Sequence, residues 1–560
     1  MAKAKYLITI CCTLWFASTP VWATDLDLDH KMDETTARAM LNRFGLGADE
    51  TSLATAMRET PRQYLINAIQ GETRLPAPIV DQIQSLPIAQ PLNEVWAQYG
   101  PGGSARANNG ENPDAKKLVQ KTENDYLNAA IQARLLTMAN SNNQGHESLL
   151  SFWLNHFSIY GEKDSDKLLA WDYAHNLEWA MKADSFEALL KASFYHAAMQ
   201  VYLDNAQSTS PTSTAGYRQA FNGKEVGINE NLARELMELH TLGVDAGYTQ
   251  KDVQELARII TGAGIYSPKM NDANLKKAGV TQMGLFLFDP RRHDFGAKIF
   301  LNQDFPAGQG FSEIDRALHI LAINPTTAHH IALKLAREYL SDNPPKTIVD
   351  AMTAGYMHSG GKISATLLPL LSSHEFALSL TSPTKFKDPL NYTISAARIA
   401  CSGTPIGNRF LLTSTMRDMG EAPFLHTTPD GYGVTESDWL SPAAMAKRTR
   451  LAMSIASNKA PFASFSTSFA TNFANSSDVN NTEPSSTMPM NTTAPMPSTT
   501  APISLNPKQL AKNGIACQPN INIVEKLIGP VSSTTQAAEA GLSDAERIGL
   551  LLASPEFMQR

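Results

Sequence analysis

The sequence predicts a mainly α protein, a multi-helix, bundle-like globular domain with at most one small β-hairpin and a disordered insert. Apolar residues recur three or four positions apart along most of the chain, which is the helical period. Alternating strand patterns are scarce, and capping residues stand where several helical segments begin. The 560 residues are 43% hydrophobic and 18% charged, which is enough apolar material for a buried core.

The charge balance excludes one large class of function. Lys and Arg number 47 against 54 Asp and Glu, for a formal net charge of −7. A protein that binds nucleic acid through bulk charge needs a basic excess to neutralise phosphates. We therefore expect no nucleic-acid partner.

The first 23 residues have the three parts of a secretory signal peptide. A basic start, MAKAK, precedes a short apolar run at 6–17 and small residues at Val21 and Ala23. The run is too short to span a bilayer comfortably, and acidic residues follow it. We expect cleavage after Ala23, export to the periplasm or beyond the cell, and no transmembrane segment in the mature chain. Loss of Lys3 and Lys5 would bring the net charge to −9.

Cleavage would leave two cysteines, Cys401 and Cys517. In an oxidising compartment they favour a disulfide across the low-complexity segment. Two separate buried thiols are the alternative. Neither cysteine lies in a C-x-x-C motif, so the pattern gives no zinc or redox signature.

Several helices are predicted from their own residues. Apolar spacing predicts helix over 177–203, and the Thr249/Asp252 capping box starts another that Gly262 stops. A helix is expected from Ser312, and Asn324-Pro325 begins the next.

Other segments break the helical pattern. The runs 285–289 and 298–301 could pair as the one β-hairpin, and 97–116, rich in Gly, Asn and Pro, predicts a long loop. Residues 461–506 are mostly Ser, Thr, Asn, Pro, Ala and Met, which predicts a linker or mobile loop.

These boundaries predict one main helical domain over 24–460. Helical patterning resumes at 507–560, and we expect that segment to pack back on the main domain.

A series of short motifs, in order along the chain, resembles the bacterial family catalogued as domain of unknown function 1800. The densest match is NENLARELMELHTLGVDAGYTQKDVQELARIITG at 229–262. The others are LNRFGLGA (41–48), SFWLNHFS (151–158), MQVYLDNAQ (199–207), HDFGAKIFL (293–301), KLAREYLSDNPP (334–345), TPDGYG (428–433), WLSP (439–442) and LLASPEF (551–557). The resemblance covers nearly the whole mature chain. It implies an exported, largely helical protein, often encoded beside a second exported protein, and it brings no established activity.

The densest polar cluster lies on the helix that begins at Asn231. Asn231, Glu235 and Glu238 are spaced so that all three project from one face. Two carboxylates and an amide can ligate a hard cation or act as an acid/base pair, and Arg234 can clamp an anion. The alternative is a solvated helix face, the usual state of such charges.

His156 and Asp204 are the remaining candidates for this site. His156 stands in an otherwise apolar segment, where a satisfied core histidine is the common outcome and a metal ligand or proton carrier the functional one. Asp204 ends a helical stretch and could simply cap it, but it would be needed as a third carboxylate for a strong metal site. The candidate metal ligands are therefore Asn231, Asp204, Glu235, Glu238 and His156.

Three further features carry weaker signals. His240 is expected to cap a helix C-terminus, and His293-Asp294 with Lys298 has low specificity for catalysis. A calcium loop starting at Asp245 fails at the positions that require Gly and Glu.

Two functions from different classes fit these observations. The first is an exported, hydrolase-like or metal-dependent enzyme acting on a cell-envelope or polymeric substrate. It would use Glu235, Glu238, Arg234 and His156, with a divalent metal ion as its conceivable cofactor. The second is a non-catalytic helical scaffold that binds another exported protein, such as a co-encoded one. The motifs of serine hydrolases, nucleotide-binding proteins and zincins are absent from the sequence.

Overall fold

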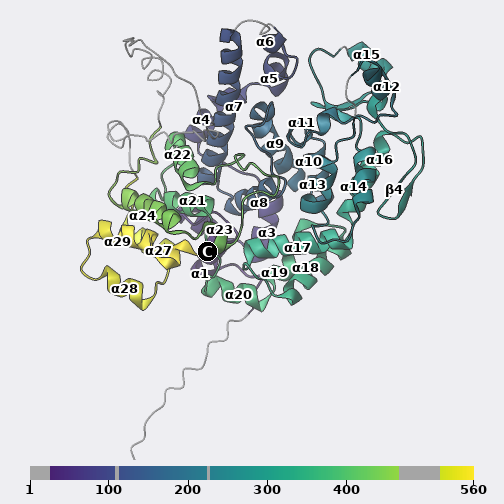
Figure 1. Cartoon of the computed structure of the whole chain (residues 1–560). Helices are drawn as coiled ribbons and strands as arrows, with labels where there is room; N and C mark the ends of the chain where they lie inside the picture. Colours follow the sequence, from purple (N-terminus) through teal and green to yellow (C-terminus); the bar gives the residue numbers. More distant parts are fainter. Residues whose placement is uncertain (1–24, 108–112, 224–226, 271, 466–516) are drawn as a thin grey trace, which may run out of the picture.

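The chain is predominantly helical, as the sequence predicts (Figure 1). The computed structural model describes residues 25–107, 113–223, 227–270, 272–465 and 517–560. The predicted signal peptide at 1–23 lies outside the described residues, as does the low-complexity segment beyond residue 465. The mainly α class is confirmed.

Short helices lead into the long helix α7. They are α1 (Glu34–Arg43), α2 (Glu50–Ala56), α3 (Pro61–Gln70), α4 (Ala77–Gln84), the 3-10 helix η1 (Pro87–Ala89), α5 (Leu92–Tyr99) and α6 (Ser104–Ala107). The long loop predicted over 97–116 is wrong where it is described, because α5 enters the segment, α6 lies within it and α7 begins at Pro113. Proline is favoured in the first turn of a helix, so Pro113 starts α7 rather than breaking it.

Buried helices follow, connected by tight turns. They are α7 (Pro113–Asn140), α8 (Gln144–His156), α9 (Asp166–Met181), α10 (Phe186–Phe194), α11 (Ala197–Tyr202) and the 3-10 helix η2 (Asn205–Gln207). The helix predicted over 177–203 is divided among α9, α10 and α11. Asp184 has a φ of 52°, and Ser185 and His196 each cap a new helix with their side chains. A left-handed residue and two N-caps end the helical run although its apolar spacing continues.

The segment 229–262, the densest match to the family, forms α13 (Asn231–Glu235), the π-helix η3 (Leu236–His240) and α14 (Gln250–Ile259). Helix α12 (Thr214–Phe221) precedes it and α15 (Asp272–Lys277) follows it. The predicted capping box of α14 is confirmed, since Thr249 and Asp252 exchange side-chain-to-backbone hydrogen bonds.

The strands are three residues long and form two small antiparallel sheets. They are β1 (Ala263–Ile265), β2 (Thr281–Met283), β3 (Phe286–Phe288), β4 (Lys298–Phe300) and β5 (Gln303–Phe305), with the 3-10 helix η4 (Pro290–Arg292) between the sheets.

The predicted hairpin of 285–289 with 298–301 is wrong, because β3 pairs with β1 and β2 while β4 pairs with β5. Leu301 and Asn302 have φ values of 48° and 60°, the two positive angles of a tight two-residue hairpin turn. This local turn gives β4 its partner, and the buried β3 becomes the centre of its own sheet.

The next helices form one side of the molecule in Figure 1, with α18 packed between α17 and α19. They are α16 (Phe311–Ala322), α17 (Pro325–Tyr339), α18 (Lys346–Ser359), α19 (Ile363–Leu371) and α20 (His374–Thr381). The predicted start of α17 is confirmed, because Asn324 accepts from the Thr326 N–H and Pro325 occupies the first turn. Helix α16 begins at Phe311, with Gly310 rather than Ser312 at the cap.

The last helices pack around the fully buried helix α21. They are α21 (Pro389–Ala400), α22 (Arg409–Met419), α23 (Glu436–Trp439), α24 (Pro442–Ala456), α27 (Ile521–Ile528), α28 (Ser533–Glu539), α29 (Asp544–Leu552) and α30 (Pro555–Met558). Helix α27 contacts α21, and α29 contacts α24. The Cys401–Cys517 disulfide is confirmed, with the two Cα atoms 4.8 Å apart.

The apolar side chains form one large core that runs from α1 to α30. Phe462, the second residue of the predicted low-complexity segment 461–506, is buried in this core, and its carbonyl accepts from the Asn408 N–H. Across the described ranges, no helix has both the length and the apolar character needed to cross a bilayer.

Candidate functional site

His156 lies in the core at the end of α8, and only 2% of it is exposed. Its Nε2 is 3.1 Å from the carbonyl oxygen of His240, so Nε2 carries the proton that it donates, and Nδ1 is buried without a partner. Burial, reinforced by the charge of Lys334, lowers the pKa of His156 well below its usual value. This histidine is therefore neutral and out of reach of a substrate at the surface.

Two more histidines and a lysine lie around His156. Burial, with the charge of Lys334 adding to it, lowers the pKa of His240 to about 3 and that of His330 to about 4. The pKa of Lys334 itself falls to about 8, because burial outweighs the attraction of Asp430. The predicted capping role of the His240 side chain is wrong, since both of its ring nitrogens are buried without hydrogen bonds. The core removes the water that a charged cap would need.

Glu235 and Glu238 lie close together on half-buried helical surface, at the end of α13 and in η3. The pKa of Glu235 is raised, first by burial and then by the negative charges of Glu238 and Asp430, against the opposing charge of Arg234. Asp430 belongs to the loop TPDGYG and reaches this helix from far along the chain. We call Glu235, Glu238 and Asp430 the acidic cluster.

Asp430 differs from Glu235 in its surroundings. Burial alone would raise its pKa, but hydrogen bonds from Thr428 and His426 outweigh burial and lower it. The Thr428 hydroxyl donates to Asp430 Oδ1 at 2.6 Å, and His426 Nε2 lies 3.3 Å from the same oxygen. The acidic cluster thus contains one carboxyl group with a raised pKa and one with a lowered pKa.

Arg234 is held by its own neighbours. Its guanidinium lies 3.4 Å from Glu238 and 3.6 Å from Glu230, and it donates to Gln250 at 2.9 Å. Asn231 shares the helix but is exposed, and its backbone N–H donates to Asn229. Arg234 therefore supports the acidic cluster, and the Asn231 side chain stands outside it.

Asp204 faces a different partner from the one predicted. It forms an ion pair with Lys163 at 2.8 Å, and Lys163 also donates to the carbonyl of Tyr202. The Tyr202 hydroxyl donates to Thr427, next to the acidic cluster, and the charges of Glu235 and Asp430 help burial to raise its pKa.

The five candidate metal ligands do not form one set of ligands. His156 is in the core, Asp204 is paired with Lys163, and Asn231 is exposed. Within the part of the chain that the structure describes, no three or more His, Cys, Asp or Glu side chains are grouped so that they could hold a metal ion.

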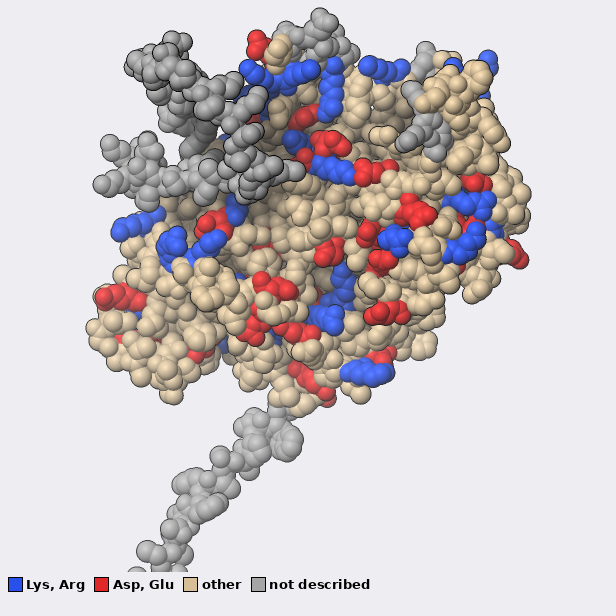
Figure 2. Space-filling model, in the orientation of Figure 1, with Lys and Arg blue, Asp and Glu red and all other residues tan. Residues whose placement is uncertain are grey.

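Acidic side chains gather across the middle of the face in Figure 2, around a small group of Lys and Arg side chains. In the same orientation, α13 and α17 lie in the middle of Figure 1, so this charged region coincides with the elements that carry Glu235 and Lys334.

A pocket lies beside the loop that carries Asp430. It encloses about 820 Å³ outside protein atoms, the open space at its mouth included, between α8, α17, the start of α21 and residues 421–434. His426 lines the pocket and also contacts Asp430, so the pocket is next to the acidic cluster, although none of the three acidic residues lines it.

Sequence reasoning missed Asp430, Lys334 and the carboxyl groups of the pocket. Asp430 and Lys334 both lie in short motifs that carry the family resemblance, TPDGYG and KLAREYLSDNPP. Their position in family motifs was the one sequence feature that could have pointed to them, because no spacing along the chain relates Asp430 or Lys334 to Glu235.

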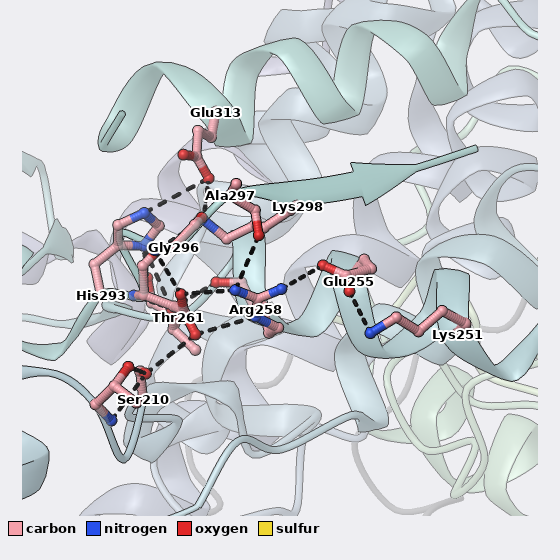
Figure 3. A network of polar contacts seen from close by, with 12 residues as sticks. Ser210, Lys251, Glu255, Arg258, Thr261, His293, Gly296, Ala297, Lys298 and Glu313 are labelled. Atoms are coloured by element: carbon pink, nitrogen blue, oxygen red, sulfur yellow. Dashed lines mark hydrogen bonds and ion pairs between the residues drawn. The ribbon is translucent and has the colours of Figure 1, made fainter. Parts of the chain in front are cut away.

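His293, Asp294 and Lys298 belong to a buried structural network (Figure 3). Lys298 Nζ lies 2.7 Å from Glu313, while Arg258 lies 3.1 Å from Asp294 and close to Glu255. His293 Nδ1 is 2.8 Å from the carbonyl of Thr261. None of these residues lines the pocket beside the Asp430 loop. The network ties β4 to α14 and α16.

The fold and the motif positions define a class of protein: a large, mainly helical protein in which several of the sequence motifs meet at the loop TPDGYG. The chain belongs to the family described as Protein of unknown function (DUF1800), whose model matches residues 39–559. No curated protein and no solved structure matches the chain.

Proposed function

We propose that the protein is an exported, hydrolase-like enzyme that uses general acid–base catalysis on a cell-envelope or polymeric substrate. The observation that carries the proposal is the opposite displacement of two pKa values, raised at Glu235 and lowered at Asp430. Pairs of carboxyl groups whose environments separate their pKa values are typical of acid/base sites. The Cys401–Cys517 disulfide fits an oxidising, extracytoplasmic compartment.

Each carboxyl group has one role in the proposed step. Asp430, ionised, takes a proton from a water molecule whose oxygen forms the new bond at the scissile centre. Glu235, protonated, gives its proton to the leaving atom as the old bond breaks. Solvent then returns a proton to Glu235 and removes one from Asp430. Lys334 lies near Asp430 and adds positive charge beside the developing negative charge.

The other predicted residues act as positioning residues in this proposal. Glu238 helps to keep Glu235 protonated, and Arg234 holds Glu238. His156 donates to the carbonyl of His240 and so fixes the end of η3, the element that carries Glu238. Because the candidate metal ligands are separated, the acid–base version has more support than the metal-dependent one.

The test is a screen of the mature protein for products released from peptidoglycan sacculi, polysaccharides and polyesters. Glu235→Gln and Asp430→Asn should each lower turnover by about 10²–10⁴-fold. Glu375→Gln, on an exposed part of α20, is the matched control and should leave turnover unchanged.

The pH profile gives a second readout. Activity should fall at low pH as Asp430 takes up a proton and at high pH as Glu235 loses one, and Glu235→Gln should remove the basic limb. Turnover that survives both substitutions would reject the assignment.

A non-catalytic scaffold remains the second candidate, and one observation favours it. Tyr217 and Phe221 lie one turn apart on α12 and are 66% and 92% exposed. Exposed aromatic side chains are common in protein interfaces. If no substrate is turned over and Tyr217→Ser/Phe221→Ser abolishes co-purification of a second exported protein, the scaffold function is supported.

A further inference from the structure

The pocket beside the acidic cluster has an unusual charge balance. Three carboxyl groups line it, those of Glu338, Asp388 and Glu421. Glu338 is paired with Arg560 at 2.5 Å. Arg134, the cation in the lining, is paired with Glu147. Asp388 and Glu421 are the carboxyl groups of the lining that form no ion pair among the described residues. From outside the lining, Arg448 attracts both of them, and Lys387 and Arg560 attract Asp388.

Asp388 and Glu421 meet at the start of the buried helix α21. Asp388 accepts from the backbone and side chain of Asn391 at 2.6 and 2.7 Å, and Glu421 accepts from the Leu390 N–H at 2.8 Å. Glu421 is 9% exposed and forms no ion pair with any residue that the structure describes. Burial raises its pKa well above the usual value, and the charges of Asp388 and Glu338 add to this effect against that of Arg448.

The rest of the lining suits a ligand that is both polar and apolar. Ser158 is only 5% exposed, and its hydroxyl has no hydrogen-bond partner among the described residues. Phe152, Phe424 and Tyr432 add aromatic rings. The Tyr432 hydroxyl is already used, because it donates to Ala422 at 2.8 Å.

We propose that this pocket binds a small organic ammonium ion, with Glu421 as its counter-ion. An ammonium group has three donors and no acceptor, which matches two carboxyl groups and a free hydroxyl. Aromatic faces attract such cations. A bare metal ion fits less well, because no three or more His, Cys, Asp or Glu side chains in the described ranges are grouped to hold one.

Binding has a proton balance that can be measured. Burial raises the pKa of Glu421 and so favours its protonated form in the empty pocket. Pairing with an ammonium ion requires the carboxylate, so wherever Glu421 is protonated its proton passes to solvent on binding. Between the usual carboxyl range and the raised value, each bound ammonium ion should release close to one proton.

The experiment is titration calorimetry of the mature chain with n-butylammonium and with n-butanol, which has the same carbon chain and no charge. Each titration is run at pH 6 in two buffers of different ionisation enthalpy, which reports protons released. We expect butylammonium to bind with proton release and butanol to bind at least about tenfold more weakly, since a charge-assisted contact is lost.

Two variants assign the site. Glu421→Gln, close in shape to the protonated carboxyl group, should fold, bind butylammonium about tenfold more weakly or worse and release no proton. Ser158→Ala should weaken binding by a few-fold through loss of one hydrogen bond. Equal binding of amine and alcohol, no binding of the amine, or unchanged binding by Glu421→Gln would each overturn the proposal.

The Glu235→Gln variant separates this proposal from the proposed hydrolysis. Glu235 does not line the pocket, so this variant should bind butylammonium as the unaltered chain does while losing turnover. Failure of either result leaves the other intact.

Discussion

The side-chain amide of Asn155 is bonded at both ends to the backbone of Tyr432. Its Nδ2 donates to the Tyr432 carbonyl at 3.0 Å, and its Oδ1 accepts from the Tyr432 N–H at 2.7 Å. Gly431, at a φ of 77°, packs so closely on Asn155 that a Cβ atom would lie 2.3 Å from the Asn155 carbonyl oxygen. The motif SFWLNHFS (151–158) thus fixes the loop that brings Asp430 to Glu235.

Asn155→Asp should release this loop. The new carboxylate keeps the acceptor for the Tyr432 N–H but places a second acceptor against the Tyr432 carbonyl, which costs about 1–3 kcal/mol of unfolding free energy. Hydrogen exchange of residues 426–434 should become faster. Asn124→Asp on the exposed face of α7 is the control, and equal exchange in both variants would show that the contact does not hold the loop.

Reduction of the Cys401–Cys517 disulfide should destabilise the protein. The two cysteines are 116 residues apart in the sequence, so the bond closes a long loop. Removing a native disulfide typically costs about 2–5 kcal/mol. Urea unfolding with and without reductant measures the loss, and the Cys401→Ala/Cys517→Ala variant should no longer respond to reductant. Titration of Cys401 and Cys517 as free thiols in the unreduced protein would contradict the bond.

The buried histidines should make the fold sensitive to acid. The pKa of His240 is about 3 and that of His330 about 4 in the folded state, both below the ordinary 6.5. Between the folded pKa values and 6.5, the unfolded chain binds more protons than the folded one. The contribution of the neutral histidines to the free energy of unfolding is therefore fully present above pH 6.5 and is lost as the pH falls toward 4.

His240→Phe removes one of these titrating groups. As the pH falls from 6.5 toward 4, the free energy of unfolding of this variant should decrease by about 3–5 kcal/mol less than that of the unaltered protein. Thermal melts at stepped pH measure the slope. His358→Gln, on the exposed face of α18, should leave the slope as it is. An identical slope for His240→Phe would remove His240 as a cause.

The Lys298–Glu313 ion pair should be costly to break from one side. Both side chains are fully buried and 2.7 Å apart. Lys298→Met leaves a buried carboxylate without its partner and should cost about 3–5 kcal/mol. The double variant Lys298→Met/Glu313→Leu should recover much of that loss, because neither charge remains.

The exposed Lys346–Asp350 pair on α18 is the control for that measurement, and Lys346→Met should cost about 0–1 kcal/mol. If urea unfolding shows that Lys298→Met and Lys346→Met lower the free energy of unfolding equally, burial does not determine how much an ion pair stabilises the protein.

Local features were predictable because their causes lie within a few residues. The capping box at Thr249 and Asp252 and the Asn324-Pro325 start of α17 depend on hydrogen bonds within one turn. The failures came where a neighbour distant in sequence decides the outcome. The strand 286–288 took its partners from β1 and β2, and the periodicity over 177–203 contained caps that apolar spacing does not reveal.

The candidate site divides in the same way. Glu235 and Glu238 could be predicted as a pair from their spacing on one helix. The disulfide could be predicted from the number of cysteines and the expected oxidising compartment. The neighbours that alter the pKa of Glu235 were not, because Asp430 arrives on a loop positioned by Asn155. His156 was a candidate by residue type, and its burial against His240 made it a structural group.

The sequence by itself determined the helical class, the family and the residue types available for chemistry. Only the tertiary structure decided which of those residues lose water and which charges they then face. The physical reason is that helical periodicity and capping are short-range properties, whereas a pKa depends on desolvation and on charges brought together by packing. Glu235 and Asp430 lie far apart in the chain, and their opposite pKa displacements exist only once the core has formed.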